Sequence, residues 1–415
     1  MKTITNGTPK WYKNLSHSFW VNSVGISNHA GRVVAGTFFH DYTKPGSGPN
    51  TKGTFGTYCY DANGTQLWCD EFEGVDGIFG VAISGDGNIA AAAGWHDQDQ
   101  ALLRAYDATT GTSLLDYTEI QHRVSCVSLS DDGNVLAAAA DDVYLFVKTG
   151  TAFPATPVKM GIADAAHDFV SSVAVDPGGN WLAACDTMGN VHLGVISGGK
   201  IQKQIWTAPE VPLDPSNPGS GSAPVPFLSV QVAKNSRAFV VGGGDLVYLF
   251  DADALQAPIK YDTRDANTPT APAGRTTAPE NLRWVAISGD GTLVSAVANR
   301  LDAAKKPDAG LLVLLSRKDG QLCKVWDEML DRNPNSTSMN SAGTYVSLAD
   351  GYPLGTPGKF CLFDASGNEL WRYSTSNMNW PMVVSPCGAG IAAGGDDGNF
   401  YYLSEPEKEP ALRTS

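Results

Sequence analysis

The stretch GVAISGDGNIAAAAG, residues 80–94, decides how this chain folds. It contains a short apolar strand and a strand of small residues, and the Gly-Asp-Gly between them supplies the backbone conformations of a tight turn. Close copies are CVSLSDDGNVLAAAA (126–140), SVAVDPGGNWLAAC (172–185) and WVAISGDGTLVSAVA (284–298). Weaker copies are SVGISNHAGRVVAG (23–36), SVQVAKNSRAFVVGG (229–243), STSMNSAGTYVSLA (336–349) and MVVSPCGAGIAAGG (382–395). The sequence is therefore built from repeats.

A second hairpin follows most copies, as in GTYCYDANGTQLWCDEF, LVYLFDADALQAPIKY and KFCLFDASGNELWRY. It carries an Asp-containing turn and an aromatic residue that we expect to wedge between neighbouring units: Trp68, Tyr117, Trp206, Tyr261, Trp326 and Trp371. Four strands recurring about every 50 residues are typical of one blade of a β-propeller. The sequence predicts an all-β chain in which residues 1–415 form a single propeller of eight blades, each of four antiparallel strands. The blades start near residues 23, 80, 126, 172, 229, 284, 336 and 382.

The eighth copy lacks an obvious fourth strand, because the chain ends with GNFYYLSEPEKEPALRTS. The segment TNGTPKWYKNL, residues 5–15, has the turn-then-Trp shape of GNELWRY, with Trp11 in the aromatic position. We expect residues 5–15 to complete the last blade and so close the ring without leaving a free sheet edge.

Charge and composition narrow the choice of partner. A formal net charge of −14 disfavours nucleic acid and anionic membranes as partners. No apolar stretch approaches the ~20 residues that a membrane-spanning helix needs. The N-terminal residues show no signal peptide, which favours the cytoplasm, although an exported protein whose signal was removed would read the same. We expect a monomer. Cys59 and Cys69 flank one hairpin and are either free thiols or a cross-strand disulfide.

The strings YDANGTQLW (60–68), YDATTG (106–111) and FDASGNELW (363–371) resemble the repeat of the PQQ-like, or quinoprotein alcohol dehydrogenase-like, propellers. The VAISGDGN stretches are equally similar to WD-type repeats. These resemblances imply blade architecture, and propellers of such families serve as enzymes, scaffolds and receptors. Quinoprotein enzymes are longer and use a vicinal Cys pair, which this chain lacks. PQQ is therefore not expected, and no cofactor is predicted.

The two faces of the predicted disc differ in their loops. Turns within each hairpin, such as SGDGN and ASGN, are uniformly short. The second-to-third loops and the connections between blades lie on the other face and are long, as in residues 41–56, 207–227 and 262–281. Long loops on one side of a rigid scaffold commonly carry function. We expect this loop-bearing face to be the working face.

Several side chains on that face could carry chemistry. His40-Asp41 and His96-Asp97 occupy matching loops in adjacent blades, where they could bind Ca²⁺ or a transition metal or exchange protons. An acid recurs at this loop in every blade and either surrounds a cation or accepts N–H bonds within its own turn. These acids are Asp41, Asp97, Asp141, Asp186, Asp245, Asp302, Asp350 and Asp396.

Residues just before each first strand should surround the mouth of the central channel. The mixture of aromatic, amide and charged groups there suits a protein, a peptide or a small polar ligand. The candidates are Trp20, Asn22, Asp76, Arg123, Asp168, Arg283, Trp284, Asn335, Asn379 and Trp380.

Two functions follow as hypotheses. The first is a non-enzymatic propeller that binds a ligand or a protein on its loop-bearing face. The second is an enzyme, a lyase, hydrolase or oxidoreductase, with a shallow His/Asp or metal site at the channel mouth. No catalytic residue can be assigned, because the sequence has no GxSxG, HExxH, CxxC or P-loop motif.

Overall fold

The computed structural model describes residues 5–15, 20–39, 53–75, 77–97, 100–162, 169–212, 222–263, 279–301, 307–352 and 356–404. Every regular element in these ranges is a β-strand, which confirms the all-β prediction. Within the same ranges, no helix is long and apolar enough to cross a membrane.

Four consecutive strands pair antiparallel in each unit of the first half of the chain, and one bridge between Phe38 and Gly77 joins the first two units, which are called sheets 1 and 2 here. Sheet 1 contains β3 (Trp20–Ile26), β4 (Arg32–Phe38), β5 (Gly53–Asp61) and β6 (Gln66–Val75). Sheet 2 contains β7 (Gly77–Ile83), β8 (Ile89–Asp97), β9 (Gln100–Asp107) and β10 (Ser113–Tyr117). Sheet 3 contains β11 (Cys126–Leu129), β12 (Val135–Ala139), β13 (Val143–Val147) and β14 (Val158–Lys159). Sheet 4 contains β15 (Val170–Val175), β16 (Trp181–Asp186), β17 (Asn190–Ser197) and β18 (Lys200–Thr207).

The second half repeats this plan after a small hairpin of β19 (Val211–Pro212) and β20 (Ser222–Ala223). Sheet 5 contains β21 (Phe227–Val232), β22 (Ala238–Gly243), β23 (Leu246–Asp251) and β24 (Ile259–Asp262). Sheet 6 contains β25 (Pro279–Ile287), β26 (Leu293–Leu301), β27 (Pro307–Lys318) and β28 (Gln321–Leu330). Sheet 7 contains β29 (Asn333–Met339), β30 (Tyr345–Tyr352), β31 (Lys359–Asp364) and β32 (Glu369–Ser374). Sheet 8 contains β33 (Asn379–Val384), β34 (Gly390–Gly395), β35 (Asn399–Ser404) and the N-terminal β2 (Pro9–Asn14).

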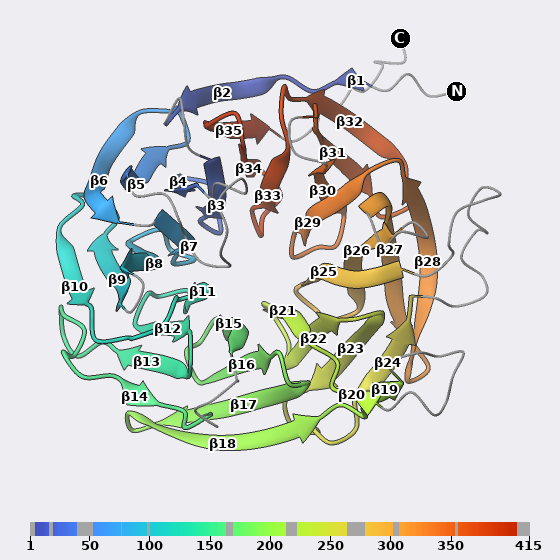
Figure 1. Ribbon diagram of the computed structural model, residues 1–415, viewed down its shortest axis with the longest axis horizontal. Coiled ribbons are helices and arrows are strands. Elements are labelled where there is room, and N and C mark those ends of the chain that lie inside the picture. Colours follow the sequence, from blue (N-terminus) through green and yellow to red (C-terminus); the bar gives the residue numbers. More distant parts are fainter. Residues whose placement is uncertain are drawn as a thin grey trace, which may run out of the picture.

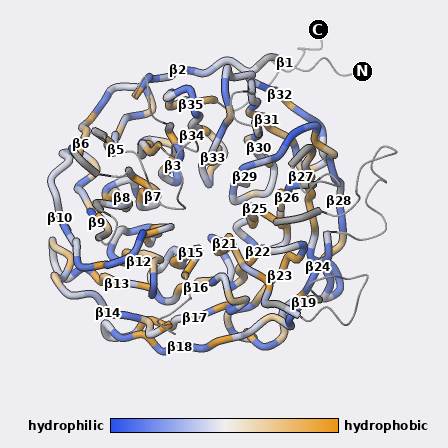
Figure 2. Tube along the Cα trace, in the orientation of Figure 1, coloured by the Kyte–Doolittle hydropathy of each residue, from blue (hydrophilic) through white to orange (hydrophobic). Residues whose placement is uncertain are grey.

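The sheets are arranged around a common axis, with the first strand of each sheet nearest the axis and the fourth at the rim (Figure 1). Each first strand contacts the first strand of the next sheet, and β3 of sheet 1 also contacts β33 and β34 of sheet 8. Figure 2 shows hydrophobic stretches on the strands all around the axis. The apolar core therefore lies between neighbouring sheets.

Strand β2 pairs antiparallel with β35, with Trp11 opposite Tyr402. This is the pairing that the sequence predicts for the N-terminal segment. The start of that segment differs from the prediction, because β1 (Thr5–Asn6) runs parallel to β32 at the outer edge of sheet 7. The N-terminal residues thus contact both of the last two sheets.

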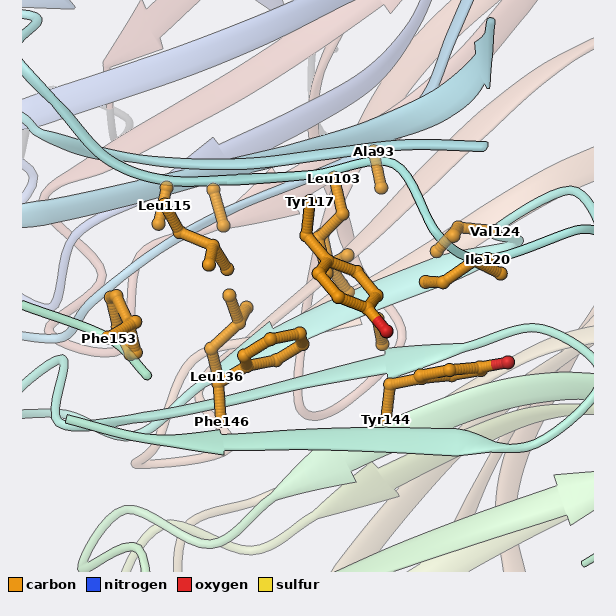
Figure 3. Close-up of a cluster of buried hydrophobic side chains, with 14 of the residues drawn as sticks. Ala93, Leu103, Leu115, Tyr117, Ile120, Val124, Leu136, Tyr144, Phe146 and Phe153 are labelled. Carbon is orange, nitrogen blue, oxygen red and sulfur yellow. The ribbon is translucent and has the colours of Figure 1, made fainter. Parts of the chain in front are cut away.

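Packing between sheets combines alanine-rich second strands with large rings from the outer strands. Between sheets 2 and 3, the ring centroid of Tyr117 lies 5.2 Å from that of Phe146 and 6.4 Å from that of Tyr144 (Figure 3). Burying a large apolar side chain contributes roughly 1.5–3 kcal/mol. Because small side chains on β8 and β12 let the sheets approach, these rings fill the remaining space.

Three indoles of fourth strands also hydrogen-bond to the next sheet. Trp68 Nε1 donates to Ala108 O at 3.0 Å, Trp326 Nε1 to Ala365 O at 3.1 Å and Trp11 Nε1 to Ala62 O at 3.1 Å. These alanines follow the Asp of the YDA and FDA strings, and that Asp caps its own turn, as Asp61 does for the N–H groups of Asn63 and Thr65. The recurrent motif is therefore a turn that receives the Trp of the preceding sheet.

The first hairpin turns form a chain of backbone hydrogen bonds on the face opposite the long connections, which we call the plain face. Each turn donates an N–H group to a carbonyl of the next turn, and sheet 8 donates back to sheet 1. Among the described residues no such bond joins sheet 4 to sheet 5, where the N–H group of Gly178 donates to Asp176 Oδ2 at 3.1 Å instead. The donor and acceptor pairs are Asn28 and Gly85, Asp86 and Asp131, Asp131 and Pro177, Asn235 and Gly289, Gly289 and Ser341, Ser341 and Pro386, and Cys387 and Asn28.

All seven cysteines lie in the described residues and are free. Cys59 is opposite Trp68 and Cys69 is opposite Tyr58 in the β5–β6 pairing, so successive positions point to opposite faces of the sheet. Cys59 is buried and Cys69 is exposed. The structure therefore selects free thiols over the cross-strand disulfide.

Candidate functional site

A β-bulge recurs near the start of the first strands, at the end of the sheet that faces the long connections. Seven of the eight pairings between first and second strands shift register at this level. A bulge places one extra residue in the strand and re-aims its side chain, and bulges are common next to functional sites. The extra positions include Asn22, Phe79, Ser171, Leu228, Arg283 and Asn335.

Aromatic rings form a continuous series beside these bulges, which we call the aromatic arc. The centroids of Trp380 and Trp20 are 6.0 Å apart, and Trp20 lies 5.2 Å from Phe39 and 6.1 Å from Phe38. Phe38 lies 4.2 Å from Phe79, which lies 5.9 Å from Trp95. Trp20 is buried, whereas Phe39, Phe79, Trp95 and Trp380 are partly exposed. The arc is Trp380, Trp20, Phe39, Phe38, Phe79 and Trp95.

Arg123 extends the arc towards sheet 4. Its guanidinium carbon lies 4.7 Å from the ring centroid of Phe79, 5.2 Å from that of Trp95 and 5.0 Å from that of Phe169. Burial lowers the pKa of Arg123 from its usual value, but a guanidinium stays charged at neutral pH. This face therefore presents a cation between aromatic side chains.

Trp380 at the other end of the arc donates its indole N–H to Asp396 Oδ1. Burial raises the pKa of Asp396 to about 7, the Trp380 hydrogen bond opposes this shift and the nearby Asp397 adds to it. Burial likewise raises the pKa of Asp350 to about 6, and the charge of Lys359 opposes that shift. Asp396 lies in the second-to-third turn of sheet 8, whereas Asp350 lies near the end of the second strand of sheet 7, β30.

The three amide residues predicted at the channel mouth, Asn22, Asn335 and Asn379, differ in their hydrogen bonds. Asn379 is fully buried, and its Oδ1 accepts a hydrogen bond from Thr375 Oγ1 at 2.8 Å. Asn335 Nδ2 donates to the carbonyl oxygen of Asn379. The buried Oδ1 of Asn22 has no hydrogen-bond partner among the described residues. Of these three predicted amides, Asn379 is held inside the fold.

Arg283 and Trp284 lie on the opposite side of the axis, on β25. With the Asn299 amide oriented to satisfy both of its polar atoms, its oxygen accepts from Arg283 Nε at 2.8 Å and its nitrogen donates to Pro334 O at 3.2 Å. Trp284 is 38% exposed, so this side also presents an aromatic surface to solvent.

The remaining predicted residues cannot be placed. Asp76, Asp168, His40 and Asp41 lie outside the described residues, and so do the side chains of His96 and Asp97 at the end of β8. Among the side chains that are described, no group of three or more His, Cys, Asp and Glu residues could hold a metal ion. The metal hypothesis for these histidines stays a prediction.

The recurrent loop acids serve different local roles. Asp186 accepts the backbone N–H groups of Met188 and Asn190, each at 2.9 Å, and lies 2.8 Å from His192 Nε2. Burial would raise the pKa of Asp186, but the hydrogen bond from His192 and the backbone N–H bonds hold it below its usual value. Asp141 Oδ1 accepts from Tyr144 at 2.9 Å. Asp186 therefore caps its own turn, whereas Asp141 is bound by a tyrosine hydroxyl.

Two surface depressions lie away from the arc, at the rim. One is lined by Leu145, Val147 and Val158 beside the short strand β14, and the other by Ile259 and Leu322 beside the short strand β24. A short fourth strand leaves the sheet edge uncovered, which accounts for both depressions.

Phe39, Trp95 and Phe169 are parts of the site that sequence reasoning missed. Phe39 directly follows the second strand of sheet 1 and Trp95 lies near the end of the second strand of sheet 2, so neither precedes a first strand. Trp95 pairs with Gly77 and packs beside Arg123. The long second strand IAAAAGWHD, which continues past its alanines to an indole, is the signal that could have found Trp95.

Comparisons with known proteins identify the fold. No protein-family model matches the chain, and no curated protein is similar to it. Its fold is similar to that of Sqt1 from Chaetomium thermophilum, with a TM-score of 0.67, 12% identity and coverage of 96% of this chain and 98% of that one. A second similar structure is the Dos1 propeller, with a TM-score of 0.65, 13% identity and coverage of 96% and 95%.

A third is Chaetomium thermophilum Sqt1 bound to the N-terminus of the ribosomal protein L10, with a TM-score of 0.66, 13% identity and coverage of 96% and 100%. These similarities show a β-propeller fold, the architecture that the WD-type resemblance implies. The resemblance to PQQ-like repeats stays untested. The chain is an all-β protein with the β-propeller fold.

Proposed function

We propose that this protein is a non-enzymatic propeller that binds a peptide segment of a partner protein on its loop-bearing face. The observation that carries the proposal is the aromatic arc, in which Phe39, Phe79, Trp95 and Trp380 from three sheets stay partly exposed. Contiguous exposed aromatic groups rimmed by polar residues mark interaction sites, and Trp residues are enriched among the anchors of protein interfaces.

A structural neighbour supports a peptide as the ligand. Sqt1, which has the same fold, has been solved bound to the N-terminus of the ribosomal protein L10. A chain terminus is a flexible segment that can lie across several blades, as the arc here would require. Arg123 and the bulged polar residues Asn22 and Ser171 add hydrogen-bonding groups beside the rings, which suits a peptide better than a purely apolar ligand.

We also propose that the sheets form an eight-bladed ring that the N-terminal strand closes. The pairing of Trp11 with Tyr402 and the backbone hydrogen bond from Cys387 to Asn28 support this arrangement. A closed ring holds the arc rigidly, since its members come from sheets 8, 1 and 2. Rigid presentation lowers the entropic cost of binding.

A peptide selection tests the function. Peptides of 12 residues are selected from a phage-displayed random library on the purified protein, and the strongest one is labelled with fluorescein and titrated by fluorescence polarisation. Trp380→Ala and Phe39→Ala should each weaken binding tenfold or more, because both rings are partly exposed members of the arc.

Ile205→Ala is the matched control, because Ile205 is an exposed apolar residue on the rim strand β18. It should bind like the unaltered protein, and circular dichroism should show that all three variants are folded. Folded Trp380→Ala and Phe39→Ala variants that bind the peptide with unchanged affinity would refute the proposed use of this face.

A further inference from the structure

We propose that Arg123, Trp95 and Ser171 form a subsite for a carboxylate group on the loop-bearing face. The inference rests on the proposed function in placing the ligand on this face, and it adds that the ligand carries an acidic side chain or a chain-terminal carboxylate. The guanidinium carbon of Arg123 lies 5.2 Å from the ring centroid of Trp95, and Ser171 is the bulged residue of sheet 4, two positions after Phe169, which also packs on Arg123.

The first argument is the way in which Arg123 is held. Three rings surround its guanidinium at 4.7–5.2 Å, and none of them accepts a strong hydrogen bond, so the N–H donors of Arg123 are left available. Arg123 makes no ion pair or hydrogen bond with any residue that the structure describes. Stacking on aromatic faces restrains a guanidinium while keeping its planar fork free for a carboxylate.

The second argument is a set of buried polar atoms without partners. Arg123 Nε, Trp95 Nε1 and Ser171 Oγ are all buried and have no hydrogen-bond partner within the described part of the chain. A buried donor left unpaired costs about 1–3 kcal/mol. Arginine and tryptophan only donate, so the missing partner is a hydrogen-bond acceptor. A ligand that supplies acceptors would offset these costs.

The charge of the site selects a carboxylate over a phosphate. Arg123 is the one cation that packs on Phe79, Trp95 or Phe169 among the described residues. A single guanidinium matches the single charge and the planar, two-oxygen geometry of a carboxylate. A phosphate group carries nearly two charges at neutral pH and is commonly held by a cluster of basic groups. The chemistry therefore points to a carboxylate.

The close pairing of β7 with β8 fixes the position of Trp95. Gly77 is opposite Trp95 and brings no side chain of its own to the indole, and its φ of 124° is in the region that favours glycine. A Cβ atom at the neighbouring Gly94 would lie 1.9 Å from Gly77 O, so this close approach of β7 and β8 requires glycine there. The position of the indole is thus fixed by the strand pairing.

An indole NMR titration tests the subsite without any peptide. The protein is labelled with ¹⁵N at its tryptophan side chains, and the Trp95 signal is identified by its loss in Trp95→Phe. N-acetylglutamate should produce a saturable downfield shift of the Trp95 Nε1–H signal, whereas N-acetylglutamine, the neutral isostere, should not. No shift, or equal shifts with the two compounds, would overturn the proposal.

Substitutions distinguish binding of the carboxylate at Arg123 from a general effect of the added compound on the protein. Arg123→Gln should abolish the saturable shift, whereas Arg237→Gln, in a turn on the plain face, should leave it unchanged. The residues Asp76 and Asp168 are close to the site in sequence and bring carboxylates of their own. If the shift appears only in Asp76→Asn or Asp168→Asn, the chain itself occupies Arg123 and the proposal is wrong.

The outcome is independent of the peptide test. If Trp380→Ala and Phe39→Ala leave peptide binding intact, the proposed function fails, but the response of Trp95 to N-acetylglutamate is unaffected. If peptides bind through the arc while Trp95 ignores N-acetylglutamate, the function stands and the carboxylate subsite fails.

Discussion

A Cβ atom at Gly85 would lie 2.3 Å from Asn28 Nδ2 and 2.5 Å from Asp131 Cγ. These two side chains hydrogen-bond to each other at 2.9 Å, and Lys234 Nζ pairs with the same carboxylate. Residues of sheets 1, 3 and 5 therefore meet beside the Gly85 backbone on the plain face. At the scale of the single residue, close approach explains this glycine, because its φ is not positive.

Because a Cβ atom here meets only the ends of the Asn28 and Asp131 side chains, which can shift, Gly85→Ala should destabilise the fold by up to about 1 kcal/mol through loss of their hydrogen bond. Gly31→Ala is the matched control, since a Cβ atom there has no neighbour within 4 Å. Urea denaturation of both variants measures the difference. Equal midpoints for Gly85→Ala and the unaltered protein would contradict the described contact.

Asp396 predicts how stability depends on pH. Its pKa is raised to about 7 in the fold from 3.8, so the fold favours the protonated carboxyl group and its ionisation costs free energy. This contribution to stability is complete below about pH 4 and is lost as the pH rises through 7. Asp396→Asn, which cannot ionise, should be more stable than the unaltered protein at pH 8 by about 1–3 kcal/mol.

The free energy of unfolding, measured with urea at pH 5 and pH 8, checks this sign. The advantage of Asp396→Asn should shrink at pH 5. Asp253→Asn removes an exposed surface acid and is the control that should show little change. An Asp396→Asn advantage that is larger at pH 5 than at pH 8 would mean that the carboxylate is stabilised in the fold.

At the scale of the element, fourth strands join neighbouring sheets through their Trp residues. Trp68 donates its indole N–H to Ala108 O at 3.0 Å, whereas Trp206 packs on Tyr248 and Phe250 and its indole nitrogen has no described hydrogen-bond partner. The two residues hold the same place in sheets 1 and 4. A comparison of Trp68 with Trp206 therefore contrasts an indole that packs and donates a hydrogen bond with an indole that only packs.

Trp68→Phe should therefore cost about 1 kcal/mol more than Trp206→Phe, because only the first removes an indole N–H donor and leaves Ala108 O with the weak thiol donor of Cys59. Both substitutions remove the same ring volume, and the difference between their unfolding free energies measures the hydrogen bond together with the deeper burial of Trp68. Identical losses would show that the bond contributes nothing in the folded protein.

At the scale of the whole molecule, the sequence predicted the repeat, the first-strand hairpins and the pairing around Trp11. Each depends on a local pattern that recurs along the chain, and the excess strand at one end matches the deficit at the other. The aromatic arc could not be predicted in full, because Phe39 and Trp95 reach it only through strand pairing and register. The parallel pairing of Thr5 with Trp371 is set by where the chain passes sheet 7, which no periodicity encodes.

Deletion of residues 1–15 should lower the midpoint of thermal unfolding and favour oligomers, because it exposes the edge of β35. Light scattering after size-exclusion chromatography and a thermal melt measure both effects. Removal of residues 405–415, which takes away no described strand, is the matched control. A fully stable monomer lacking residues 1–15 would contradict closure by the N-terminal strand.

The plain-face hydrogen bonds all run in one direction around the axis, and the step from sheet 4 to sheet 5 has no such bond because the Gly178 N–H group donates to Asp176 Oδ2. The junction without a plain-face backbone hydrogen bond is thus the one between sheets 4 and 5, and not the one that contains the chain ends. Local opening of the structure is therefore expected first between sheets 4 and 5. At the chain ends, by contrast, the N-terminal strand β2 pairs with β35, and the backbone hydrogen bond from Cys387 to Asn28 links sheet 8 to sheet 1.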